Sequence, residues 1–177
     1  MAYSREVCAV SLGSVESAKP EEPQMRWCSA VVSRELEAPS RLRTMTAAAL
    51  EAWDLLELAE AAELCVSELV TNAVRHGTGS AIGFALSITD RVIVEVFDYG
   101  PGTPVAKPVG EEFEGGRGLW LVEAIAEDWG WERLHHEWKR VWCTFTPPGA
   151  RRQADGPERS ADRSGPEHAA GKVSCPP

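Results

Sequence analysis

Two neighbouring segments constrain the fold of this chain more than any other part of it. Residues 81–88 (AIGFALSI) and 91–98 (RVIVEVFD) alternate in hydropathy or run apolar, and they include several β-branched side chains. The dipeptide Thr89-Asp90 between them favours a tight turn. Together these features predict a β-hairpin, so the fold contains an antiparallel pair of strands.

The segments before the hairpin predict one strand and two helices. Residues 25–32 (MRWCSAVV) favour a strand. Ser40 is a suitable N-cap for a helix that extends through Leu50 and Trp53. Apolar residues then recur at helical spacing between residues 57 and 76, and Gly77 supplies a C-terminal stop for this second helix.

After the hairpin, residues 99–116 are rich in proline and glycine, which excludes regular structure over a long connection. Long loops inside compact domains are usually functional. Residues 117–129 (RGLWLVEAIAEDW) restore a helical pattern, and residues 129–138 and 140–148 predict a closing pair of strands. This order predicts an α+β fold, a two-layer α/β sandwich in which helices cover one face of a mixed, mainly antiparallel sheet.

Composition indicates one folded domain with two tails. The chain has 177 residues and 44% hydrophobic content, enough for one sizeable core. Residues 1–24 contain the breaker-rich KPEEP at positions 19–23 and predict a flexible leader. Residues 149–177 contain almost no large apolar side chains and predict a disordered tail. The working domain is therefore expected over residues 25–148.

Charge and cysteine usage narrow the functional classes. The formal net charge of -9 argues against binding to nucleic acid or anionic lipid through mainly electrostatic attraction. The five cysteines are scattered, odd in number and without a CxxC pair, so neither a disulfide framework nor a zinc site is indicated. No apolar run approaches the ~20 residues of a membrane span, and no secretory signal is present at the N-terminus. A cytoplasmic protein is expected.

Three short motifs carry chemistry: ELVTNAVRHG (68–77), VFDYGPG (96–102) and GGRGLWLV (115–122). Each alone has an ordinary explanation, because Glu68 and Asn72 suit a solvated helix edge, Asp98 suits a turn, and glycines suit a flexible helix entry. No GK[ST] occurs that would make a P-loop. A glycine cluster that opens a helix can still hold phosphate oxygens through backbone N–H groups.

In this order the three motifs resemble the N, G1 and G2 boxes of the GHKL (histidine kinase-like) ATPase superfamily, over about residues 39–148. Within it the chain is most similar to stand-alone ATP-binding domains such as anti-sigma factor serine/threonine kinases. The resemblance implies the Bergerat fold, with ATP and Mg²⁺ as cofactors. It also implies a homodimer.

The resemblance assigns roles to three polar residues. Asn72 matches the asparagine that coordinates Mg²⁺, a cation that prefers oxygen ligands. Glu68 matches the general base towards the attacking hydroxyl or water, and it stands one helical turn earlier on the same face. Asp98 matches the aspartate that accepts a hydrogen bond from the adenine amine and so selects ATP over GTP.

The resemblance also assigns the glycine-rich segments to nucleotide contacts. In the first of them the backbone passes close beneath the base at Gly100 and Gly102, where a side chain would occupy the space. Residues 103–114 would form an ATP lid. The predicted phosphate cradle at the following helix consists of Gly115, Gly116, Gly118 and the adjacent Leu119, while Arg117 suits either a phosphate contact or a solvated position.

One departure from the superfamily pattern stands at the last strand. Many members have a Gly-Thr pair there, with the threonine near the adenine aspartate, whereas this chain reads WKRVWCT over residues 138–144. Neither Thr144 nor Thr146 can be given that role from the sequence.

His76 is interpreted as a capping or packed side chain, and His135 and His136 lack the spacing of metal ligands.

Two functions follow from the resemblance. The first is a protein serine/threonine kinase that uses Mg·ATP, binds a sigma factor and phosphorylates the antagonist of that factor. The second is a non-catalytic, nucleotide-responsive module that sequesters a regulatory protein and needs Asp98 but not Glu68. A detached histidine-kinase domain is less well supported, because no helix pair with a phosphoacceptor histidine precedes the motifs. A soluble α+β domain with accidental motifs is the remaining alternative.

Overall fold

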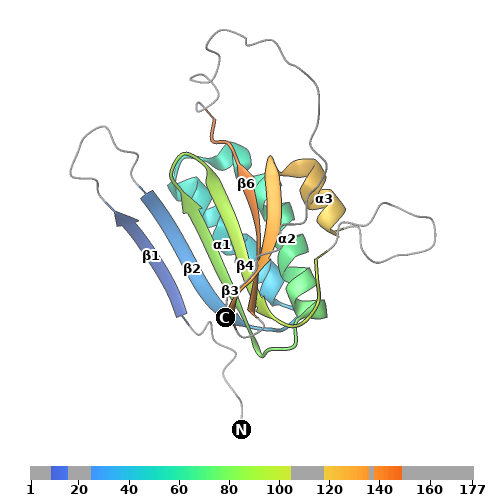
Figure 1. The fold of residues 1–177 in the computed structure, drawn as a ribbon. Coiled ribbons are helices and arrows are strands. Elements are labelled where there is room, and N and C mark those ends of the chain that lie inside the picture. The colour runs from blue at the N-terminus through green and yellow to red at the C-terminus, as the bar shows by residue number, and fades with distance from the viewer. Residues whose placement is uncertain (1–8, 16–24, 105–117, 136–137, 149–177) are drawn as a thin grey trace, which may run out of the picture.

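The computed structural model describes residues 9–15, 25–104, 118–135 and 138–148, and its strands form one six-stranded sheet (Figure 1). The strands lie in the order β1-β2-β3-β4-β6-β5, and every pair in the described part of the chain is antiparallel rather than mixed. Their bounds are β1 (Ala9–Val15), β2 (Met25–Ser33), β3 (Ala81–Ile88), β4 (Val92–Tyr99), β5 (Asp128–Arg133) and β6 (Trp138–Phe145).

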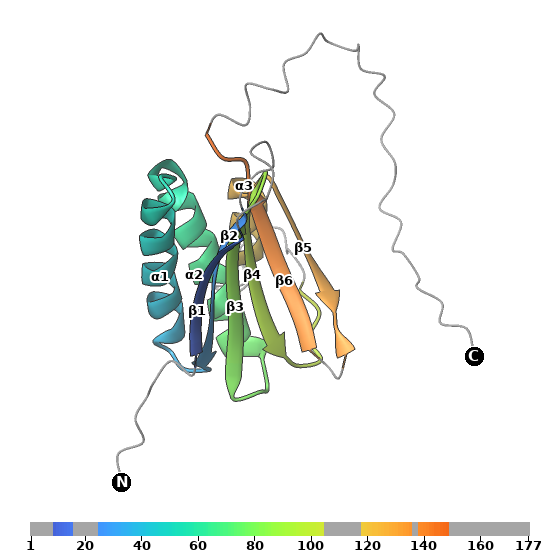
Figure 2. The ribbon, with the colours of Figure 1, turned by 90° about the vertical axis from the view of Figure 1, so that its left-hand side faces the viewer.

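The helices cover one face of this sheet (Figure 2). They are α1 (Ala38–Ala52), the 3₁₀ helix η1 (Leu56–Leu58), α2 (Ala59–His76) and α3 (Gly118–Ile125). Helices α1 and α2 pack against each other, and α3 packs against α2. This arrangement confirms the predicted α+β two-layer sandwich with helices on one face of the sheet.

The core lies between the two layers and follows the two periodicities of the sequence. Burial alternates along the predicted hairpin, so β3 and β4 each turn every second side chain towards the helices. Helix α2 buries one face at helical spacing, namely Ala62, Cys65, Val66, Leu69, Val70 and Ala73. Each fully buried aliphatic side chain contributes about 1.5–3 kcal/mol to stability, which fixes the orientation of α2 over the sheet.

Strand β1 lies inside the segment that the sequence assigned to a flexible leader. Residues 9–15 pair with β2 along their whole length, from Ala9 opposite Val31 to Val15 opposite Met25. The segment AVSLGSV is short and mixes small polar with apolar residues, so its own strand signal is weak. Pairing with β2 provides its backbone hydrogen bonds, and the sheet therefore starts before the predicted boundary at residue 25.

Helix α1 starts earlier than the predicted N-cap at Ser40. Its first residue is Ala38, and Pro39 lies in the first turn, where a fixed φ suits the helix and the missing N–H has no partner to lose. The N-cap residue is Glu37, and it makes no capping hydrogen bond through its side chain. Ser40 therefore lies inside the helix, and the proline marks the helix start instead.

On the outer face of the sheet, glycines stand opposite aromatic residues of the neighbouring strand. Gly13 faces Trp27 at one edge of the sheet, Gly130 faces Trp142 at the other, and Gly83 faces Phe97 between them. A Cβ atom at Gly130 would lie 2.7 Å from Cζ2 of Trp142. The aromatic rings thus cover the glycines, which compensates for the weak strand preference of glycine.

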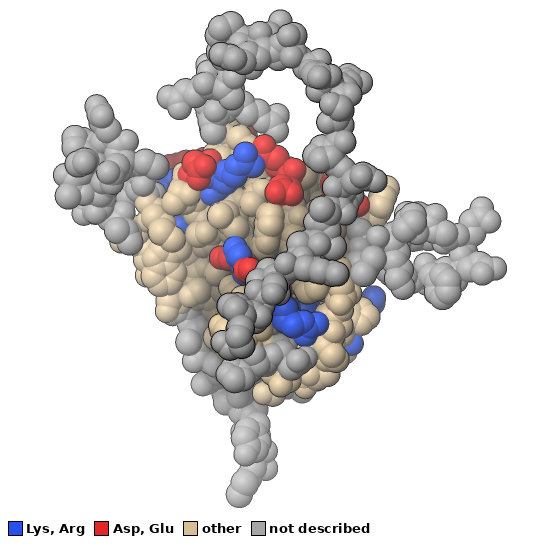
Figure 3. All heavy atoms as spheres, viewed as in Figure 1, with Lys and Arg blue, Asp and Glu red and all other residues tan. Residues whose placement is uncertain are grey.

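Acidic and basic side chains are mixed on the face of the molecule seen in Figure 3. Arg140 of β6 pairs with Glu95 at 2.5 Å and with Glu132 at 2.7 Å. Arg91 pairs with Glu127 at 2.9 Å.

In the described part of the chain, no helix is both long and apolar enough to cross a membrane.

The three cysteines within the described ranges, Cys28, Cys65 and Cys143, are buried free thiols. Burial raises the pKa of the Cys28 thiol to about 11. The neighbouring Cys65 and burial both raise the pKa of Cys143. These cysteines therefore act as small core side chains, in agreement with the absence of a disulfide pattern in the sequence.

Candidate functional site

Helix α2 presents Glu68 and Asn72 on one face, one turn apart, as the sequence predicted. Both side chains are half-buried. Neither has a hydrogen bond or ion pair with any other residue that the structure describes. An acid and an amide that are partly removed from water and have no partner among the described residues are available to contact a ligand.

The first residue of α3 lies directly against this pair. A Cβ atom at Gly118 would overlap Oε2 of Glu68 and would lie 3.5 Å from Nδ2 of Asn72. Only glycine fits here while the Glu68 carboxylate keeps its position. The acid and the amide therefore face the N-terminus of α3, where helix N–H groups lack intrahelical partners.

The C-terminal end of α2 is tied to the end of β4. The backbone N–H of Thr78 donates to the carbonyl oxygen of Tyr99 at 2.6 Å, and the Thr78 hydroxyl donates to the same oxygen at 3.2 Å. Asp98 immediately precedes Tyr99 on β4. The candidate adenine-reading carboxylate is thus held beside the end of the helix that carries Asn72.

A side chain from the end of β2 reinforces this connection. Arg34 donates from Nε to the carbonyl of Gly79 at 2.5 Å and from Nη1 to the carbonyl of Val74 at 2.9 Å. Val74 is in the last turn of α2, where carbonyl groups lack intrahelical partners. Arg34 therefore stabilises the helix end and the loop that follows it.

Gly100 has a positive φ of 156°, and its backbone packs against the end of α2. A Cβ atom there would lie 3.3 Å from the carbonyl oxygen of His76 and 3.5 Å from Cα of Gly77. A side chain is disfavoured by both the backbone conformation and the space. Gly100 is therefore required for packing against the end of α2, and its close approach to a base stays a prediction.

Asp98 is almost completely buried on the helix-facing side of the sheet, with 2% of its surface exposed. Its Oδ1 atom lies 2.9 Å from Nζ of Lys139, which stands opposite it on β6 and is 4% exposed. Among the described residues, no donor meets this Oδ1 with good hydrogen-bond geometry. Burial raises the pKa of the Asp98 carboxyl, and the direct contact with Lys139 and the charges on Lys139 and His76 oppose that rise only in part.

Lys139 is a buried neighbour of Asp98 that the sequence motifs did not indicate. The inward residues of β6 are Lys139, Val141, Cys143 and Phe145, so a charged residue begins an otherwise apolar series. That interruption is the signal that was available in the sequence. Its meaning depends on the strand register, which places Lys139 opposite Asp98.

The remaining predicted residues have different outcomes. A Cβ atom at Gly102 would meet nothing within 4 Å, so packing within the described protein does not require glycine there. The Leu119 side chain is buried in the core, which leaves only its backbone for a ligand. Three predicted residues lie outside the described ranges, together with the predicted lid over most of its length: Gly115, Gly116 and Arg117.

The two threonines considered for the last strand lie far along it from Asp98. Thr144 pairs with Ile93, at the other end of β4. Thr146 lies beyond β6, and its hydroxyl contacts the Glu127 carboxylate. Neither is the neighbour of Asp98, because the register gives that position to Lys139.

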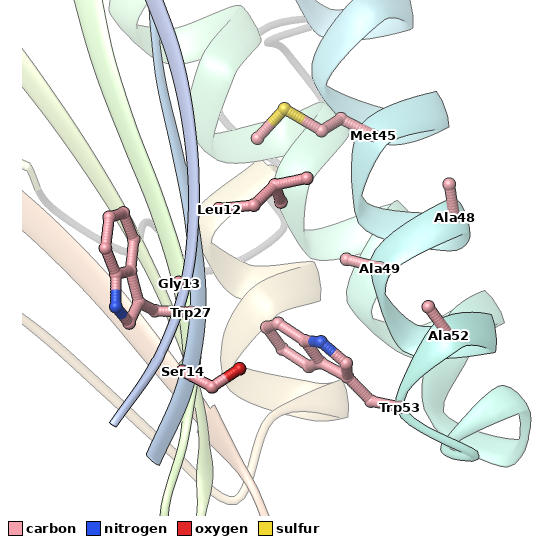
Figure 4. A pocket seen from close by; sticks show the side chains of 9 residues that line it. All are labelled: Leu12, Gly13, Ser14, Trp27, Met45, Ala48, Ala49, Ala52 and Trp53. Atoms are coloured by element: carbon pink, nitrogen blue, oxygen red, sulfur yellow. The ribbon is translucent and has the colours of Figure 1, made fainter. Parts of the chain in front are cut away.

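A separate groove of about 480 Å³ lies between the β1 edge of the sheet and α1 (Figure 4). Met45 of α1, Trp53 just after α1 and Leu12 of β1 point into it. Its lining is mainly apolar and includes none of the candidate site residues. The groove is therefore distinct from the site on α2, β4 and α3.

Within the described ranges, no group of three or more His, Cys, Asp or Glu side chains is placed to hold a metal ion. His76 is exposed at the end of α2, where it was expected to cap or pack. A metal ligated only by protein side chains is therefore not indicated in this part of the chain. A cation held jointly by Asn72 and a ligand's oxygens remains compatible with the donor set.

The sequence was compared with models of protein families and with curated proteins. Residues 32–145, more than half of the chain, match the family model described as Histidine kinase-like ATPase domain. A search of curated proteins found no significant match. The matched span includes α2, the end of β4, the start of α3 and Lys139. The chain therefore belongs to the histidine kinase-like ATPase family.

Proposed function

We propose that this protein binds Mg·ATP and transfers the γ-phosphoryl group to a serine or threonine of a protein partner. The observation that carries the proposal is the position of Glu68, which faces the first residue of α3 and has no partner among the described residues. A carboxylate in that position can accept a proton next to the phosphate-binding end of a helix.

The residues present fit a magnesium ion. Asn72 carries one amide oxygen on a half-buried side chain, and the Nδ2 atom of the same amide lies next to the space that a side chain at position 118 would fill. When bound, Mg²⁺ neutralises charge on the phosphates. Asn72 would hold it together with the phosphate oxygens.

Each of the other residues has a distinct task in this proposal. Asp98 accepts a hydrogen bond from the adenine amine through its free acceptor capacity. The backbone at the start of α3 binds phosphate oxygens through unpaired N–H groups. Glu68 orients the incoming hydroxyl and accepts its proton during transfer.

The partner is proposed from the sequence resemblance to anti-sigma factor serine/threonine kinases. On that basis the chain acts in the cytoplasm as a homodimer that binds a regulatory protein: a sigma factor, the antagonist of that factor, or both. Its net charge of -9 disfavours direct binding to nucleic acid. Transfer to a protein hydroxyl would change the partner's charge and so its binding.

The test is retention of partners from native cytoplasm on the immobilised full-length chain, with and without Mg·ATP, followed by transfer of radiolabelled γ-phosphate to each retained protein. We expect one retained protein to be labelled on serine or threonine, and Glu68→Gln to abolish labelling while ATP binding persists. The Glu68→Gln variant is the matched control, because it keeps the shape of the side chain and removes the base.

Two outcomes would contradict the proposal in different ways. Equal labelling by wild type and Glu68→Gln would show that Glu68 is not the base. ATP-dependent retention of a partner that is never labelled would instead support the non-catalytic module that sequesters a protein.

A further inference from the structure

At one end of strands β4 and β6, the helix-facing side chains change from apolar to charged. The helix-facing residues of β4 are Val92, Val94, Val96 and Asp98, and those of β6 are Lys139, Val141, Cys143 and Phe145. The register places the two charged residues opposite each other. A buried ion pair therefore replaces apolar packing at the end of the sheet that adjoins the last turn of α2.

Stability does not explain this pair. Removing two charges from water is expensive, and their attraction compensates only with excellent geometry and further hydrogen bonds. Here the Nζ–Oδ1 distance is 2.9 Å, but the contact lacks good hydrogen-bond geometry at Oδ1. Apolar residues already fill the equivalent positions further along both strands.

The pair retains hydrogen-bonding capacity. A lysine ammonium group has three N–H donors, and Asp98 is its only ionic or hydrogen-bonding partner among the described residues. The Asp98 carboxylate is acceptor-only when ionised. The two side chains thus present an acceptor and a donor side by side in a buried position.

We propose that Lys139 is a base-contacting specificity residue that donates a hydrogen bond to the N1 ring nitrogen of adenine while Asp98 accepts one from the neighbouring amine. The inference rests on the proposed nucleotide binding and deepens it. Adenine has an acceptor, N1, next to a donor, the exocyclic amine, which complements this pair.

Guanine would meet the same pair with the opposite pattern. Its N1–H would face the Lys139 ammonium, and its O6 would face the Asp98 carboxylate. The first contact would place a donor against a donor, and the second would place an acceptor against an acceptor. Buried polar groups left without a partner in this way are strongly disfavoured. Lys139 therefore adds a second selection for ATP to the one made by Asp98.

The test compares ATP with 1-deaza-ATP, in which a C–H group replaces N1 and the amine is kept. Binding to the full-length wild-type chain is measured by calorimetry with Mg²⁺, and 7-deaza-ATP is the matched control because it alters the opposite side of the ring. We expect 1-deaza-ATP to bind at least about tenfold more weakly than ATP, and 7-deaza-ATP to bind like ATP.

The Lys139→Met variant locates the effect on the protein. It keeps the length of the side chain and lacks the donor, so ATP and 1-deaza-ATP should bind to it with equal affinity. Thermal melting checks that the variant is folded, because it leaves Asp98 without its partner. If it does not fold, the wild-type comparison of the three nucleotides decides alone.

Two results would overturn the inference: equal affinity of the wild type for ATP and 1-deaza-ATP, or a folded Lys139→Met variant that still discriminates between them. A wild-type chain that binds no ATP at all would instead overturn the proposed function. The failure of the inference and the failure of the function are thus distinguishable.

Discussion

At the scale of single residues, the site depends on a few polar groups whose partners within the described protein are missing or incomplete. Glu68 and Asn72 have none, and Oδ1 of Asp98 has only a poorly directed contact with Lys139. Oδ1 of Asp98 is buried, and leaving a buried polar group unpaired costs about 1–3 kcal/mol. Under the proposed function, a ligand that donates a hydrogen bond to this oxygen would recover part of that energy.

Gly118→Ala tests the contact between α3 and Glu68. The new Cβ atom would overlap Oε2 of Glu68, which can move because it is the end of a flexible side chain. We expect the rate of phosphoryl transfer to fall by about 10²-fold or more, since general-base catalysis contributes about 10²–10⁴-fold. The melting temperature should change little.

Glu68→Gln provides the comparison for that measurement. Both variants should lose transfer to a similar extent, because one displaces the base and the other removes it. Normal transfer by Gly118→Ala together with inactive Glu68→Gln would show that the base does not work at the start of α3.

At the scale of elements, two sets of contacts between strands and helices matter. On the outer face of the sheet, aromatic rings pack over glycines. At the candidate site, hydrogen bonds fix the end of α2 to the neighbouring strands. Gly130 on edge strand β5 lies beneath Trp142 of β6. Arg34 and the Thr78–Tyr99 hydrogen bonds connect the end of α2 to the strands. Edge and site are thus stabilised by contacts that join residues far apart in sequence.

Gly130→Ala should destabilise the protein although alanine usually favours ordered structure over glycine. Its Cβ atom would lie 2.7 Å from Cζ2 of Trp142, so the indole must shift. We expect the free energy of unfolding to fall by about 1–3 kcal/mol, as in overpacked cores. Urea denaturation measures this change.

The matched control is Gly102→Ala, the same substitution at a position with nothing within 4 Å of the new atom. It should leave the free energy of unfolding unchanged or slightly higher. Equal stability of the two variants would mean that Trp142 does not pack over Gly130 as described.

At the scale of the whole molecule, the buried ion pair between Asp98 and Lys139 is a structural feature whose proposed role in binding can be separated from its effect on stability. Replacing such pairs with apolar residues of similar volume is often neutral or stabilising by about 1–4 kcal/mol. We therefore expect Asp98→Leu with Lys139→Met to match or exceed the wild type in free energy of unfolding while losing ATP binding. Urea denaturation and calorimetry measure the two properties separately.

The single variant Lys139→Met is the control for that prediction. It leaves a buried carboxylate unpaired, so its free energy of unfolding should fall by about 3–5 kcal/mol. A double variant less stable than this single variant would show that the pair is needed for folding rather than for binding.

The pH dependence of stability has a definite sign at Asp98. Burial raises the pKa of its carboxyl in the folded chain above the ordinary 3.8, so the folded state binds more protons just above that pH than the unfolded state does. Stability from this group is therefore lost as pH rises from about 3.8 through the folded pKa. The Asp98→Leu, Lys139→Met double variant lacks this effect.

We therefore expect the free energy of unfolding of the wild type, taken relative to the double variant, to fall as pH increases over that range. Parallel urea titrations at several pH values measure the difference, and effects of other carboxyl groups cancel in it. A difference that rises with pH would mean that the Lys139 ammonium, rather than burial, dominates at Asp98.

Local pattern was sufficient for the elements with strong periodicity. Helical spacing predicted α2, alternation predicted the hairpin of β3 and β4, and three motifs in order predicted the family. It failed at Ser40, because Pro39 sets the helix start, and at β1, because that strand depends on pairing with β2. Weak local signals were thus overruled by neighbours distant in sequence.

The sequence by itself determined the family, and it determined that Glu68 and Asn72 share a helix face, because residue types at helical and strand spacing specify which groups lie together. Only the tertiary structure decided that Glu68 faces Gly118 and that Lys139 stands opposite Asp98. The physical reason is that both contacts join distant segments, and strand register and helix packing, which place them, arise from burial of the whole core.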